Sequence, residues 1–159
     1  MSVPSTVRAR RALPPPLRAA LVVGMLYSFL VGVSLLETGI SGLPEGTVDV
    51  ALIAHDPDAP RPRGFTHWAV YGIPPQDPFE VGPATIDTLR VGPNGRGEPR
   101  WMGPRPPTGH GVHRYYFWAY ALSRRVEGAP SREDFLADHA DDIIEQDRLV
   151  VHYERTPDH

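Results

Sequence analysis

The chain of 159 residues contains no cysteine. This absence excludes disulfide bonds, zinc sites with thiolate ligands, a cysteine nucleophile and lipid attachment to a cysteine. It does not indicate whether the protein works in an oxidising or a reducing compartment. The chain also lacks the G-x-S-x-G motif of serine hydrolases and the H-E-x-x-H spacing of helical zinc sites. We therefore expect neither a metal nor a cofactor.

A strong excess of charge of one sign is missing as well. The chain has 16 basic and 19 acidic residues and a net charge of -3 with histidine neutral. A whole-molecule field that would draw it onto nucleic-acid phosphates is therefore absent. We expect no nucleic-acid partner, and any site for an anion must be local.

The first 36 residues differ in composition from the residues that follow them. Residues 1–18 are basic and rich in proline, and residues 19–36 carry no charge. Because a membrane-spanning helix needs about 20 apolar residues, we interpret residues 19–36 as an uncleaved anchor with the following domain outside the cytoplasm. The alternative, which stays open, is that they form buried strands or a core helix of a cytoplasmic protein.

From residue 42 to residue 155 the pattern is that of one mainly β domain with a few short helices. Runs of β-branched and aromatic residues predict strands at 48–54, 66–73 and 113–122, and more weakly at 85–91. Ser131 is a plausible helix N-cap, and apolar residues then recur at three- and four-residue spacing as far as Ile144. Residues 148–153 predict a closing strand.

Two loops gather the polar and conformationally special residues. The first, HDPDAP at 55–60, follows a strand and holds two carboxylates on a backbone fixed by two prolines. The second, at 103–115, is rich in glycine and proline and enters a strand at His113. Together with His67, these loops would place imidazole and phenol groups beside carboxylates. A pocket lined by such groups suits an oxyanion with one or two negative charges.

The order of these segments resembles the phosphatidylethanolamine-binding protein family, in its bacterial, Raf-kinase-inhibitor-like branch. The similar segments are DPDAP at 56–60, HWAVYGIP at 67–74 and GPRPPTGHGVHRY at 103–115, with support from GLPEGT at 42–47 and DRLVVHYER at 147–155. The resemblance implies a PEBP-like β-sandwich of antiparallel strands with a C-terminal helix. Residues 1–41 lack the family's opening S-P-x-L-x-W segment, so its N-terminal strands are expected to be missing or replaced.

The resemblance also implies a ligand site and a function. The family usually has tryptophan where this chain has Phe65, which keeps an apolar wall but lacks an indole N–H. From the residues alone, Asp58 could instead pair with Arg114 and brace two loops. Positions that match the family's anion pocket are Asp56, Asp58, His67, Pro106, Gly109, Gly111, His113 and Tyr115.

Three functions remain in view. The first is a binding module, not an enzyme, for a phosphate-like anion or phospholipid head group, with a regulatory protein as a further partner. The second is a protein inhibitor of a kinase or protease that docks through its proline-rich loop surface. The third is a weak phosphoester hydrolase that uses histidine and aspartate as acid and base. The oligomeric state is left open.

Overall fold

A computed structural model describes residues 38–155. The predictions for residues 1–18 and 19–36 lie outside this range. Among the described residues, no helix is long and apolar enough to cross a membrane. The elements are β1 (Thr38–Ile40), β2 (Asp49–Asp56), β3 (Phe65–Ile73), β4 (Phe79–Val81), η1 (Ile86–Thr88), β5 (Arg90–Val91), β6 (His113–Leu122), α1 (Arg132–Asp138), η2 (Ala140–Asp142) and β7 (Ile143–Tyr153).

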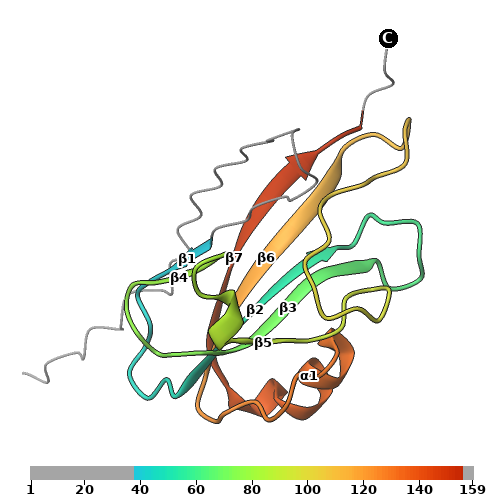
Figure 1. The fold of residues 1–159 in the computed structure, drawn as a ribbon. Helices are drawn as coiled ribbons and strands as arrows, with labels where there is room; N and C mark the ends of the chain where they lie inside the picture. Colours follow the sequence, from blue (N-terminus) through green and yellow to red (C-terminus); the bar gives the residue numbers. More distant parts are fainter. Residues whose placement is uncertain (1–37, 156–159) are drawn as a thin grey trace, which may run out of the picture.

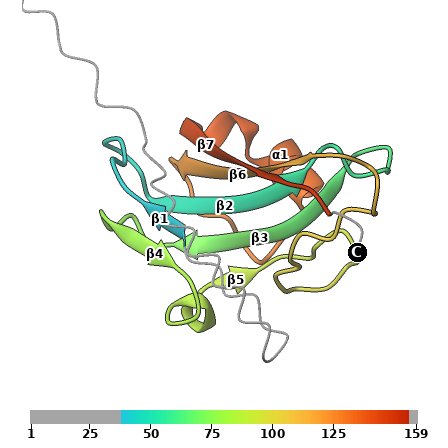
Figure 2. The same cartoon turned by 90° about the horizontal axis from the view of Figure 1, so that it is seen from above.

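The centre of the fold is a five-stranded antiparallel sheet with the strand order β5-β3-β2-β6-β7. A small antiparallel pair, β1 and β4, packs on one face of this sheet, and α1 packs on the other (Figures 1 and 2). The expected antiparallel, mainly β architecture is therefore confirmed, and among residues 38–155 the second layer has two short strands.

The central strands are apolar on both sides because both faces of the sheet are covered. All eight residues of β2 are buried. Its alternate residues fall into two clusters: Leu52 belongs to the cluster under β1 and β4, and Ile53 belongs to the one under α1. This explains why β2 reads as a continuous apolar run rather than as an alternating one.

Helix α1 is shorter than its sequence pattern predicts. Ser131 is the N-cap, as expected, and its Oγ accepts a hydrogen bond from the backbone N–H of Asp134. The helix ends at Asp138, however, and Ile143 pairs with Leu122 as the first residue of β7. Two isoleucines at helical spacing thus belong to a strand, because cross-strand pairing with β6 outweighs a short helical periodicity.

The segment at 85–91, expected as a weak strand, is only partly extended. It forms the turn η1 followed by the two-residue strand β5, which pairs with β3 through Val70 and Val91. The strand predicted at 113–122 matches β6 over its full length. Strand β4 was not predicted, because its three residues lie between prolines and carry little periodicity.

Candidate functional site

The candidate site lies where one end of the central sheet meets its loops. Strand β2 ends at Asp56, and β6 begins at His113. The two strands are antiparallel neighbours, and their register pairs His55 with Tyr116. Two loop-flanking residues that are far apart in the sequence are thereby brought together by strand pairing alone.

Asp56 and His113 form a buried pair at this end of the sheet. His113 Nδ1 lies 2.7 Å from Asp56 Oδ2, and both side chains are 3% exposed. The other carboxylate oxygen, Asp56 Oδ1, accepts the backbone N–H of Asp58 at 2.8 Å. With the carboxylate as acceptor, Nδ1 of His113 carries the proton, so Nε2 is the nitrogen left for a ligand.

His67 reaches the same site because of an irregularity in β3. Ala54 pairs with Trp68, but the next residue of β2, His55, pairs with Thr66. His67 is therefore an extra residue in β3, and such a bulge redirects a side chain. Its ring centroid lies 5.1 Å from that of Tyr115 on β6.

The orientation of the His67 ring is fixed by the backbone of the following loop. His67 Nδ1 lies 2.6 Å from the carbonyl oxygen of Met102. Because a carbonyl can only accept, Nδ1 must donate, and Nε2 of the neutral ring carries a lone pair. Burial lowers the pKa of His67 from its usual value, and this favours the neutral ring.

Aromatic rings surround the two imidazoles. Tyr115 packs against both, with its ring 5.1 Å from His67 and 6.4 Å from His113. Phe65 packs edge-on against His67 at 4.7 Å, and Trp101 lies 6.1 Å away. The site thus has imidazole and carboxylate groups within an apolar wall, and burial of this kind strengthens electrostatic interactions with a ligand.

Asp58 takes the bracing position that was one of its two interpretations. Its carboxylate accepts the backbone N–H and the Nε of Arg114, both at 2.9 Å, and Nη2 of Arg114 at 2.6 Å. These bonds lower the pKa of Asp58 to about 2. Asp58 therefore ties the β2–β3 loop to β6, and a direct role toward a ligand stays a prediction.

The remaining predicted positions lie in the loop that leads into β6. Pro106 is buried. Gly109 and Gly111 have φ values of +82° and +79°, a conformation that favours glycine, and a Cβ at either would meet nothing within 4 Å. Within residues 38–155 none of the three makes a hydrogen bond to the imidazoles. The structure thus brings Asp56, His67, His113 and Tyr115 together, and a role of Pro106, Gly109 and Gly111 toward a ligand stays a prediction.

Two contributors to the site did not emerge from the sequence. The carbonyl of Met102 fixes the His67 ring, and a backbone contact across 35 residues leaves no trace in a sequence. Trp101 packs against His67, Trp68 and Phe117, and its buried Nε1 has no hydrogen-bond partner in the described part of the chain. Its position just before the glycine- and proline-rich loop was the available signal.

The other histidines match their expected surface or packing roles. His55 and His139 are buried, and His110 and His152 are exposed. His55 Nδ1 lies 3.3 Å from Thr66 Oγ1 on the α1 side of the sheet. Over residues 38–155, no group of three or more His, Asp or Glu side chains is placed to hold a metal ion.

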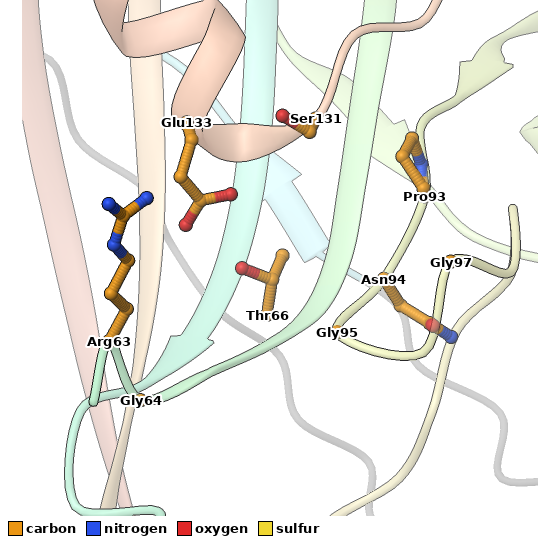
Figure 3. Close-up of a pocket in the computed structure, with 9 residues that line it drawn as sticks. All are labelled: Arg63, Gly64, Thr66, Pro93, Asn94, Gly95, Gly97, Ser131 and Glu133. Carbon is orange, nitrogen blue, oxygen red and sulfur yellow. The ribbon is translucent and has the colours of Figure 1, made fainter. Parts of the chain in front are cut away.

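A separate cavity of about 270 Å³ lies on the α1 side. It is bounded by the β2–β3 loop, the 93–97 loop and the start of α1 (Figure 3). Arg63 and Glu133 extend toward the same side of this cavity. None of the eight predicted ligand residues lines it.

Comparisons with known proteins agree with the fold and with the sequence motifs. The family model described as phosphatidylethanolamine-binding protein matches residues 31–154. A UPF0098 protein of Aquifex aeolicus is 39% identical over 125 residues, which are 74% of this chain and 72% of that protein. A UPF0098 protein of Pyrococcus horikoshii is 36% identical over 124 residues, 73% of this chain and 62% of that protein. The chain thus spans less than two thirds of the Pyrococcus protein.

Two crystal structures are similar over most of this chain. A homologue of phosphatidylethanolamine-binding protein from Chlamydia trachomatis has a TM-score of 0.69 and 32% identity, covering 78% of this chain and 84% of its own. Escherichia coli YbcL, described as a new member of the mammalian PEBP family, has a TM-score of 0.67 and 27% identity, covering 76% and 79%. The chain belongs to the phosphatidylethanolamine-binding protein family.

Proposed function

We propose that the chain binds a small phosphate-bearing anion, such as a phospholipid head group or a phosphate monoester, between His67 and His113. Membership of the family supports a ligand-binding module in general. The observation that carries the finer proposal is the fixing of both imidazoles: each Nδ1 is occupied by a protein acceptor. Each ring therefore keeps one nitrogen, Nε2, for a ligand.

The protonation state of Nε2 determines which anions the site can bind. A neutral ring protonated on Nδ1 can only accept at Nε2, so a fully deprotonated oxyanion finds no donor there. Either the ligand brings a P–OH proton or an imidazole gains a proton when the ligand binds. The Asp56 carboxylate stabilises a positive charge on His113 through their 2.7 Å contact. A phosphate monoester can bring the proton itself, because its second ionisation lies near neutral pH. The phosphodiester of a lipid head group carries no such proton, so it needs the second route.

The test is a titration of inorganic phosphate into the full chain, followed through the imidazole resonances of its histidines by NMR. We expect shifts at His67 and His113 and a loss of binding of at least tenfold in His113→Ala, because a charge-assisted hydrogen bond is lost. His152→Ala is the matched control, since His152 is exposed on β7 and should leave the affinity unchanged. Unshifted His67 and His113 resonances at millimolar phosphate would refute the proposal.

The Asp56–His113 pair also has the geometry of a carboxylate that orients an imidazole base. This observation favours a second candidate, a weak phosphoester hydrolase. Hydrolysis of p-nitrophenyl phosphate that disappears in both His67→Ala and Asp56→Asn would support it. Binding of phosphate without any turnover leaves the binding module as the function.

A further inference from the structure

The two loops that flank the site differ in charge from the rest of the described chain. Loop 57–64 joins β2 to β3, and loop 92–112 joins β5 to β6. Together they contain five arginines and two acidic residues, whereas the rest of residues 38–155 contains seven arginines and fifteen acidic residues. The site end of the molecule is therefore locally positive on a chain whose net charge is -3.

Three of these arginines keep their charge available. Both loop acids are paired, Asp58 with Arg114 and Glu98 with Arg100. Three other exposed arginines, Arg61, Arg96 and Arg105, have no acidic partner within 4 Å among the described residues. The fourth, Arg63, extends beside Glu133 at the separate cavity (Figure 3). We call Arg61, Arg96 and Arg105 the arginine rim.

Arg61 links the rim to the site itself. Its guanidinium lies 5.1 Å from the centre of the Phe65 ring, and its Nη1 donates to the carbonyl of Gly95 at 3.2 Å. Phe65 in turn contacts His67. The positive charge of Arg61 is thus held next to the wall of the candidate pocket, in a cation–π contact that leaves other N–H groups free.

An exposed apolar side chain belongs to the same loop as Arg96 and Arg105. Val112 is 55% exposed and directly precedes His113 in the second loop. Of the three large hydrophobic residues exposed on the described chain, it is the most exposed, and the other two are Val48 and Ile144. Contact with water or with a nucleic-acid backbone does not stabilise an aliphatic side chain. Burial in the boundary between lipid head groups and acyl chains does lower its free energy.

We propose that this end of the molecule docks on an anionic lipid membrane through the arginine rim and Val112. The rim contacts lipid phosphates, Val112 enters the interface, and a lipid head-group phosphate lies at the entrance to the His67 and His113 site. Docking requires only the surface; the last step rests on the proposed function. The lipid surface, rather than free phosphate in solution, is then the source of the ligand.

The absence of cysteine allows a local test on the full chain. Val112→Cys gives a single position for a polarity-sensitive fluorophore, and Val48→Cys, an exposed valine at the opposite end of β2, is the matched control. Each labelled protein is mixed with vesicles of phosphatidylcholine and phosphatidylglycerol, and with vesicles of phosphatidylcholine alone. A local label is needed because residues 19–36, if they bind membranes, would do so in every variant.

We expect a blue shift of the fluorophore at position 112 with the anionic vesicles only, no shift at position 48, and reversal at high salt. Arg61→Gln, Arg96→Gln and Arg105→Gln should each raise the vesicle concentration at half-maximal signal about fivefold, as expected for about 1 kcal/mol per arginine near such a surface. Arg125→Gln, an exposed arginine beyond the far end of β6, should leave it unchanged.

Three results would overturn the proposal: no shift at position 112, equal shifts at positions 112 and 48, or the same shift at 112 with a single-stranded oligonucleotide or an acidic peptide. These failures can be told apart from failure of the proposed function. If phosphate still perturbs His67 and His113 in the NMR titration while the label at 112 does not respond, the pocket function stands and the membrane surface does not.

Discussion

At the scale of single residues, the buried polar groups of the domain differ in how well their hydrogen bonds are satisfied. Asp56 uses both carboxylate oxygens, and each site imidazole has its Nδ1 bonded. The hydroxyl of Tyr71, by contrast, is buried on the α1 side and has no partner among residues 38–155. Burial also raises the pKa of Tyr71, so the hydroxyl stays protonated and still lacks an acceptor.

Replacing Tyr71 by phenylalanine should therefore stabilise the protein. The change removes a buried, unpartnered hydroxyl and keeps the ring that packs against Phe135 at 5.4 Å. We expect the free energy of unfolding, measured by urea denaturation, to rise by about 1 kcal/mol. Tyr116→Phe, at a partly exposed position, should change it little. A clear loss of stability in Tyr71→Phe would mean that the hydroxyl has a partner, such as a bound water.

At the scale of elements, the loops are held close to the sheet by positions that only glycine can occupy. A Cβ on Gly95 would lie 2.5 Å from two carbons of the Phe65 ring. The backbone N–H of Gly95 also bonds the carbonyl of Thr66 at 2.8 Å. The 92–112 loop thus lies directly against the start of β3, and this contact positions the aromatic wall beside His67.

Gly95→Ala should consequently affect both stability and binding. The added methyl must displace Phe65, and overpacking of this kind costs about 1–3 kcal/mol in the free energy of unfolding. We expect phosphate affinity, measured by calorimetry, to fall because His67 loses its neighbour. In Gly97→Ala the methyl meets nothing within 4 Å, and only the φ of +82° is unfavourable. That control should lose some stability and keep its affinity for phosphate. Equal affinities in the two variants would contradict the role of Phe65 as the aromatic wall beside His67.

The elements also show which parts of the site the sequence could predict. Local pattern was sufficient for β2, β3 and β6, because each is a run of β-branched or aromatic residues ended by a turn. It was sufficient to place Asp56 and His113 at strand ends. It could not reveal the bulge that turns His67 toward Tyr115, since a bulge depends on the register of two strands. Nor could it show that Met102 fixes the His67 ring.

At the scale of the whole molecule, buried histidines link stability to pH. His55 is 7% exposed, and burial lowers its pKa from 6.5 to about 4. The unfolded chain therefore binds a proton at a higher pH than the folded chain does. Its contribution to stability is complete above pH 6.5 and is lost progressively as the pH falls toward 4.

We expect the free energy of unfolding to fall by about 3 kcal/mol across this window because of His55, with His67 acting in the same direction. Urea denaturation at several pH values between 6.5 and 4 should show a shallower slope in His55→Gln than in the unchanged protein. His110→Gln, at an exposed position, should leave the slope as it is. Asp58, with a pKa of about 2, loses its charge mainly below this window. An unaltered slope in His55→Gln would show that His55 is hydrated in the folded state.

The fixed imidazole rings described at the site have a consequence for ligand choice. Hydrogen phosphate and sulfate have nearly the same size, shape and charge, but only hydrogen phosphate carries a proton at neutral pH. A pocket whose two imidazoles are both neutral offers only lone pairs at Nε2, so it accepts that proton, whereas sulfate binds only after an imidazole has gained a proton. With one ring fixed by a backbone carbonyl and the other by the Asp56 carboxylate, the protein should bind hydrogen phosphate up to a higher pH than sulfate, although no cavity could separate the two anions by shape.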